Sequence, residues 1–277
     1  MGFRRPHSQR PVGSVVRMVA RRIVVLGGTK GMGRALSRLM ASRGDRVCLL
    51  GRDGVELARS ADDLTARGAS HAGFALCDLD VPRGFAGALA KASQQLSGID
   101  VVVVTAAAFA TQAQLESDRE RLQYLLGLNF TNTILFCETA REHLMQAGSV
   151  NPTLCVFSSV AGDRGRKPVV FYGATKAGLS RYLEGLDHRF ASRGLRVVCV
   201  KPGFVRTSMT DGLPEPPFAG DPDAVAVRVL TAIDRGTPVV YAPPVWALIM
   251  SQNCTDANFV IGIVRILATP DEKPSVL

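Results

Sequence analysis

The sequence predicts an α/β protein with a doubly wound, seven-stranded parallel sheet and helices on both of its faces. Two observations lead to this expectation. Short apolar runs alternate along the chain with longer segments in which apolar residues recur at spacings of three and four. Several of the runs, such as VVVV at 101–104, are apolar at every position, as expected for strands that helices cover on both sides.

Each element follows from this alternation. Strands are expected at 22–27, 46–50, 72–77, 100–106, 153–158, 196–200 and 238–241. Helices are expected within 32–43, 54–67, 82–96, 115–146, 172–192 and 222–235. In such a sheet a ligand binds at the carboxyl ends of the strands.

The domain organisation is simple. Residues 1–20 form a basic tail that we expect to be disordered, with an upstream translation start or a transit peptide as alternatives. Residues 21–277 are expected to form one domain, because no linker divides them. Within it, 204–220 is expected to be a flap over the site, and 243–268 an apolar helical segment.

Composition excludes several classes of protein. Residues 1–22 hold six arginines and no acid, so most of the formal charge of +9 lies in this stretch and nucleic-acid binding is not expected. No apolar run approaches the roughly 20 residues needed to cross a bilayer. Six scattered cysteines indicate a reducing compartment, and we expect a cytoplasmic protein. The four histidines are too widely spaced to suggest a metal site.

The glycine-rich stretch LGGTKGMGR, residues 26–34, follows the first expected strand and precedes the first expected helix. Glycines permit a tight turn and a close approach of phosphate, and the N–H groups of a helix N-terminus attract an anion. A strand, this turn, a helix and a second strand some 20 residues on together predict a dinucleotide site.

The second expected strand ends in Gly51-Arg52 and not in an acid. An acid there would bind the adenosine ribose and repel a 2′-phosphate, whereas arginine would attract the phosphate. Lys30 could reach the same phosphate. Asp53 is the competing acid, but its place before a helix predicts an N-cap. We therefore expect NADP(H) in preference to NAD(H).

The stretch SSVAGDRGRKPVVFYGATKAG, residues 158–178, places Tyr172 and Lys176 one helical turn apart and Ser159 thirteen residues before the tyrosine. Together with the glycine turn and the later Pro202-Gly203, this order closely resembles the short-chain dehydrogenase/reductase family, whose domain is of the Rossmann type. The resemblance covers residues from about 21 to 207.

The resemblance implies a role for each matching residue. Tyr172 would be the general acid that protonates a carbonyl oxygen, and Lys176 would lower its pKa and hold the cofactor ribose. Ser159 would bind the reacting oxygen, and Asn129, at a bend in its helix, would hold a water of the proton relay. The expected cofactor contacts are Gly27, Gly28, Thr29, Lys30, Gly31, Met32, Gly33, Arg52, Asp78, Leu79, Ala106, Ala107, Pro202, Gly203, Val205 and Thr207, with Tyr172 and Lys176.

Electrostatics gives an independent reason for the pair. A cation about 4 Å from a phenol contributes roughly 4 kcal/mol at an effective dielectric constant of 20. Before desolvation is subtracted, this would lower the pKa of Tyr172 by about three units. Two residues depart from the family pattern: Leu26 replaces a hydroxyl residue, and Thr105 with Ala106 and Ala107 replaces an asparagine-rich turn.

Substrate specificity is expected to lie in the flap, with Phe204, Met209, Leu213 and Phe218 as candidate walls. The segment 243–268 either closes the core, contacts a second copy, covers a lipid-like substrate or rests weakly on a membrane surface. Arg164, Arg166 and Lys167 are solvated loop charges or bind a phosphate, a carboxylate or an acyl carrier.

The sequence thus predicts an NADPH-dependent enzyme that reduces a carbonyl compound to an alcohol, with a lipid-like or lipid-linked molecule as a candidate substrate. It would form a homodimer or homotetramer through helices 115–146 and 172–192. The alternatives are a regulatory protein that binds NADP(H) without turnover, and a peripheral membrane protein of the same fold.

Overall fold

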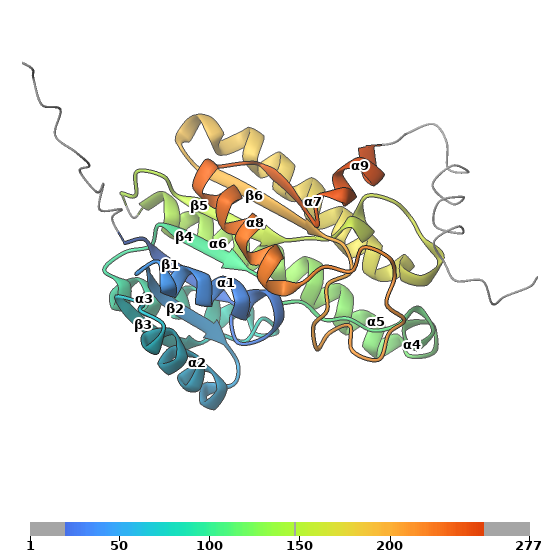
Figure 1. Cartoon of the computed structure of the whole chain (residues 1–277), viewed down its shortest axis with the longest axis horizontal. Helices are drawn as coiled ribbons and strands as arrows, with labels where there is room; N and C mark the ends of the chain where they lie inside the picture. The colour runs from blue at the N-terminus through green and yellow to red at the C-terminus, as the bar shows by residue number, and fades with distance from the viewer. Residues whose placement is uncertain (1–19, 147, 252–277) are drawn as a thin grey trace, which may run out of the picture.

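The computed structural model describes residues 20–146 and 148–251. Seven parallel strands form one sheet in the order β3-β2-β1-β4-β5-β6-β7 (Figure 1). The strands are β1 (Arg22–Leu26), β2 (Arg46–Gly51), β3 (His71–Leu76), β4 (Val101–Val104), β5 (Thr153–Phe157), β6 (Arg196–Pro202) and β7 (Val239–Ala242). The strand order changes direction between β1 and β4, so the predicted doubly wound sheet is confirmed.

Helices cover both faces of this sheet (Figure 1). On one face lie α3 (Phe85–Leu96), α6 (Thr133–Gln146) and α7 (Val170–Phe190). On the other lie α1 (Gly31–Ser42), α2 (Gly54–Ala66) and α8 (Pro222–Arg235). Alternate residues of each central strand point to opposite faces: Val24 of β1 packs with the first layer and Val25 with the second.

The expected long helix 115–146 is wrong as a single element. The segment instead contains α4 (Gln112–Ser117), α5 (Arg119–Leu126), a π-helical turn (Gly127–Asn132) and α6. Thr111 caps α4, and the Asp118 carboxylate accepts a hydrogen bond from the Arg121 N–H at the start of α5. The spacing of apolar residues does not predict these breaks, because they depend on polar caps and on a backbone bulge.

The remaining expected bounds differ by small amounts. Residues 82–84 form a 3₁₀ turn before α3, and α7 begins two residues earlier than expected. The flap 204–220 is a loop closed at its base by a bridge between Val205 and Gly220. Only α9 (Val245–Ser251) represents the expected segment 243–268; residues 252–268 and the tail 1–19 lie outside the described residues.

Candidate active site

The glycine turn is fixed by backbone contacts. Gly27 has φ +90°, and a Cβ there would lie 2.7 Å from the Ala106 nitrogen at the end of β4. A Cβ on Gly33 would lie 2.3 Å from the Gly27 carbonyl oxygen. Side chains are therefore excluded at both positions, and the turn is held against the carboxyl edge of the sheet.

The first turn of α1 fits a phosphate group. Lys30, at its N-cap, makes no side-chain capping bond, and the first turn has no acidic residue. In contrast, carboxylates of Asp53 and Asp221 accept N–H hydrogen bonds at the starts of α2 and α8. The α1 N–H groups are thus left for an external anion, which agrees with a bound dinucleotide pyrophosphate.

The end of β2, where the adenosine of a dinucleotide is expected, is basic. Asp53 is the predicted N-cap and accepts hydrogen bonds from the Val55 and Glu56 nitrogens. Glu56 pairs with Arg34 at 2.7 Å. Arg52 and Lys30 are exposed and form no salt bridge with any described residue. Both of these carboxylates are therefore engaged. Lys30 and Arg52, the second of which also hydrogen-bonds the Tyr124 side chain, supply the positive charge that could meet a phosphate.

The other expected cofactor contacts border the same edge. Leu79 is buried, and the Asp78 carboxylate accepts a hydrogen bond from the Asp80 nitrogen. The Thr105 hydroxyl donates to the carbonyl oxygens of Leu26 and Gly27, at 3.1 and 3.0 Å. Thr105 thus supplies hydrogen bonds in the turn that lacks asparagine.

Ser159, Tyr172 and Lys176 come together at the end of β5. The Lys176 nitrogen lies 5.7 Å from the centre of the Tyr172 ring and donates to the Phe157 carbonyl oxygen at 3.0 Å. The side chain of Ser159 interacts with the Tyr172 hydroxyl and acts to lower its pKa. Ser159 also contacts the Pro202 carbonyl oxygen at 3.3 Å. The three predicted residues therefore form one cluster beside β6.

The pKa expected for Tyr172 is wrong for this structure. Burial raises the pKa of Tyr172 to about 12, and this effect outweighs the contribution of Ser159. Burial also lowers the pKa of Lys176 to about 8. The expected lowering requires the Lys176 ammonium about 4 Å from the Tyr172 hydroxyl. In the structure the ammonium donates to a backbone carbonyl and faces the Tyr172 ring, so it does not offset the effect of burial.

Asn129 is buried inside the π-helical turn, where a helix bend was predicted. Its amide oxygen accepts from the Ala108 nitrogen and its amide nitrogen donates to the Ala108 oxygen, both at 2.8 Å. The side chain therefore fixes the loop after β4. Its role in a water relay stays a prediction.

The loop after β4 brings in a residue that sequence reasoning missed. Phe109 packs edge-on against Tyr172, with ring centres 5.3 Å apart. It also lines a cavity of about 300 Å³ together with Tyr124 and Arg121. No motif marks Phe109; only its place directly after the small-residue turn could have indicated it.

Trp246 is a second missed residue. Its indole nitrogen would lie 2.0 Å from a Cβ on Gly203, so the ring occupies the space that glycine leaves open. The indole N–H is buried and has no hydrogen-bond partner. Helix α9 therefore packs directly on the Pro202-Gly203 turn, next to the residue that Ser159 contacts.

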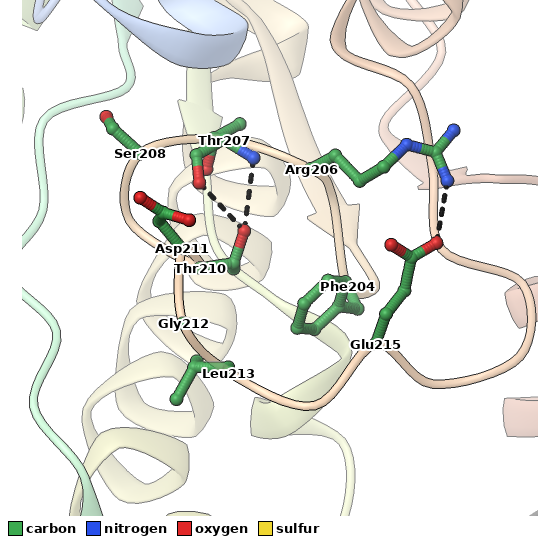
Figure 2. A pocket seen from close by; sticks show the side chains of 9 residues that line it. All are labelled: Phe204, Arg206, Thr207, Ser208, Thr210, Asp211, Gly212, Leu213 and Glu215. Carbon is green, nitrogen blue, oxygen red and sulfur yellow. Dashed lines mark hydrogen bonds and ion pairs between the residues drawn. The ribbon is translucent and has the colours of Figure 1, made fainter.

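The flap surrounds a cavity of about 410 Å³ (Figure 2). Phe204 and Leu213 line it, whereas Met209 and Phe218, also expected as walls, are outside its lining and exposed. Its other lining residues are mostly polar: Arg206, Thr207, Ser208, Thr210, Asp211, Gly212 and Glu215. A Cβ on Gly31 would lie 3.2 Å from the Thr207 methyl carbon, so the flap reaches the glycine turn.

No helix among residues 20–146 and 148–251 is long and apolar enough to span a membrane. In the same ranges, no three His, Cys, Asp or Glu side chains gather as a metal site would require.

Comparison with known proteins identifies the class. Residues 21–217 match the family described as short chain dehydrogenase, so the chain belongs to the short-chain dehydrogenase/reductase family of oxidoreductases. Members of this family use nicotinamide cofactors.

Among curated relatives, carbonyl reductase family member 4 of Xenopus tropicalis is 31% identical over 219 residues, covering 76% of this chain and 89% of that protein. A 3-oxoacyl-(acyl-carrier-protein) reductase of Chlamydia muridarum is 28% identical and covers 71% of this chain and 78% of its own. A short-chain dehydrogenase/reductase structure from Mycobacterium marinum superimposes with a TM-score of 0.72, at 22% identity, over 80% of this chain and 93% of that one.

Proposed function

We propose that this protein reduces a ketone or aldehyde to an alcohol with NADPH as the hydride donor. The observation that carries the proposal is the Ser159–Tyr172–Lys176 cluster at the same sheet edge as the uncapped N-terminus of α1. Relatives named as carbonyl reductase and 3-oxoacyl reductase support a carbonyl substrate. The bound cofactor would supply hydride to the carbonyl carbon.

Residues of the chain then stabilise and protonate the developing oxyanion. The Ser159 hydroxyl donates a hydrogen bond to the carbonyl oxygen, and the Tyr172 hydroxyl gives that oxygen its proton. The Tyr172 phenol is protonated at neutral pH, as a proton donor in reduction must be. Lys176, while protonated, stabilises the phenolate that remains.

The preference for NADPH is supported by the charges at the end of β2. Asp53 is engaged in capping and Glu56 in pairing with Arg34, so neither carboxylate is free to repel a 2′-phosphate. Arg52 and Lys30 would contact that phosphate.

The first experiment replaces the proton donor. Tyr172→Phe is expected to reduce turnover at least 100-fold because the general acid is lost, with NADPH affinity unchanged. Tyr182→Phe is the matched control: Tyr182 lies on the same helix, but its hydroxyl donates to Glu138 at 2.7 Å, away from the cluster. Absorbance at the NADPH band against a panel of aldehydes, ketones, 3-oxoacyl thioesters and keto-lipids gives the rates. Turnover that survives in Tyr172→Phe would refute the mechanism, and NADPH binding without turnover in the wild type would favour a regulatory protein.

A second experiment tests the cofactor. Arg52→Ala is expected to weaken NADPH binding 10- to 100-fold, as for the loss of one hydrogen bond to a charged group, and to leave NADH binding unchanged. Arg59→Ala, an exposed arginine on α2, is the control. Equal effects on both cofactors would exclude a 2′-phosphate contact.

We also propose an oligomeric state and a cellular location for the enzyme. The exposed apolar side chains Leu126, Phe130 and Leu135 on the α5–α6 segment, and Val170 at the start of α7, support a homodimer or homotetramer. Five buried cysteines without disulfides support a cytoplasmic location. The polar lining of the flap cavity gives no support to the expected lipid-like substrate.

A further inference from the structure

The loop between Ser159 and Tyr172 is rich in cations and has one acid. Arg164, Arg166 and Lys167 lie within residues 160–169, and Asp163 is the single carboxylate there. Asp163 is already engaged: one oxygen lies 2.6 Å from the Lys201 nitrogen, and the other accepts from the Tyr241 hydroxyl at 3.0 Å. Both of its oxygens are therefore engaged with groups other than Arg166.

Arg166 is the informative member of this group. Its side chain is partly buried, and its Nε atom is shielded from solvent and has no hydrogen-bond acceptor within residues 20–146 and 148–251. Burial lowers the pKa of the guanidinium, and no carboxylate opposes this effect. Among the described residues, no salt bridge includes Arg166. Arg22 shows the usual alternative, because its pairing with Asp100 raises its pKa.

A partly buried cation without a counter-ion is costly, since lost hydration is not replaced. The cost is reduced when an anion binds, and guanidinium binds carboxylate and phosphate through two parallel hydrogen bonds. The environment of Arg166 therefore favours an anionic ligand.

Arg166 is also close to the reacting group along the chain. It caps the 3₁₀ turn Lys167–Val169, which leads directly into α7 and Tyr172. Only six residue steps separate Arg166 from Tyr172, so their Cα atoms lie at most roughly 20 Å apart. The Gln112 side chain holds this junction by accepting from the Val170 nitrogen at 2.9 Å. An arginine side chain, a tyrosine side chain and a small molecule between them can together span such a distance.

We propose that Arg166 binds an anionic group, a carboxylate or a phosphate ester, on the carbonyl substrate. This inference rests on the proposed reductase function and names the substrate class: carbonyl compounds with an oxyanion several bonds from the carbonyl carbon. Arg166 is a binding residue in this scheme, and Ser159 and Tyr172 carry out the chemistry.

The test compares charged and neutral probes of one shape. Wild type, Arg166→Gln, Arg166→Lys and the control Lys167→Gln are assayed with 4-carboxybenzaldehyde, 4-formylphenyl phosphate and the neutral methyl 4-formylbenzoate. Arg166→Gln is expected to raise KM for at least one charged aldehyde 10-fold or more, and to change KM for the ester less than 2-fold. Arg166→Lys should recover part of the loss, and Lys167→Gln should behave as wild type. The charged probe that responds more strongly identifies carboxylate or phosphate as the preferred group.

Two outcomes overturn the inference: equal losses for charged and neutral probes, which would mean a structural role, or no change for either charged probe. If wild type reduces none of the three aldehydes, calorimetric titration with the charged aldehydes decides the inference separately from the proposed activity. Binding that Arg166→Gln weakens 10-fold supports the anion site, and absence of that effect excludes it.

Discussion

The glycine turn and the flap approach each other at Gly31 and Thr207, but they are held in different ways. At the turn, added Cβ atoms at Gly27 and Gly33 would meet backbone atoms at 2.7 and 2.3 Å. At Gly212 in the flap, no atom lies within 4 Å of such a Cβ. Beyond the backbone bridge at its base, the flap is held by side chains: the Thr210 hydroxyl donates to the Val205 oxygen. Arg206 also pairs with Glu215 at 2.9 Å, as Figure 2 shows.

This difference indicates that the turn and the flap suit different roles in binding. Backbone atoms cannot move aside without disturbing the sheet, so the turn is suited to hold a cofactor shared by many reactions. Exposed side-chain contacts rearrange at low cost, so the flap is suited to adapt to one substrate. Three experiments test this contrast.

The largest effect is expected at the turn. Gly33→Ala places a Cβ against the Gly27 carbonyl oxygen, and overpacking of this kind costs about 1–3 kcal/mol of unfolding free energy. Because the turn must shift, NADPH affinity should fall at least 100-fold in a fluorescence titration. Gly185→Ala is the matched control: it is also a helical glycine, but it faces open space and should stabilise α7 by up to about 1 kcal/mol. Equal affinities in the two variants would show that the turn is not rigid.

The next largest effect is expected for the titration of Lys176, whose side-chain nitrogen donates a hydrogen bond to the Phe157 carbonyl oxygen at the edge of the sheet. Since burial lowers its pKa to about 8, Lys176 is an ammonium below that pH and neutral above it. We expect kcat/KM for reduction to be constant up to about pH 8 and then to decline, approaching tenfold per pH unit. Lys176→Arg keeps its charge throughout and should remove the decline. A wild-type profile that stays flat to pH 9.5 would contradict this role.

The smallest effect is expected in the flap. Arg206→Met and Glu215→Gln each break an ion pair in which both side chains are half exposed, which costs less than about 1 kcal/mol. KM for the carbonyl substrate should change less than about 5-fold, and NADPH affinity should not change. Steady-state kinetics of both single variants and the double variant measure the coupling. A loss of cofactor affinity would show that the flap takes part in holding the cofactor.

Sequence and structure agree where a pattern is local. Valine runs, helical spacing and glycines directly after a strand predicted the strands, most of the helices and the turn, and Asp53 before a helix is its N-cap. They differ at the segment 115–146, because the caps at Thr111 and Asp118 and the bulge around Asn129 interrupt an otherwise helical pattern.

The sequence by itself determined the family and the fold, and it predicted the residues of the candidate site, because each is encoded by residue types at short, fixed spacings. Only the tertiary structure decided the environment of those residues: the raised pKa of Tyr172, Phe109 against its ring, Trp246 over Gly203, and Arg166 without a carboxylate partner among the described residues. These properties arise from contacts between segments that are mostly distant in sequence, and from the exclusion of water that those contacts produce.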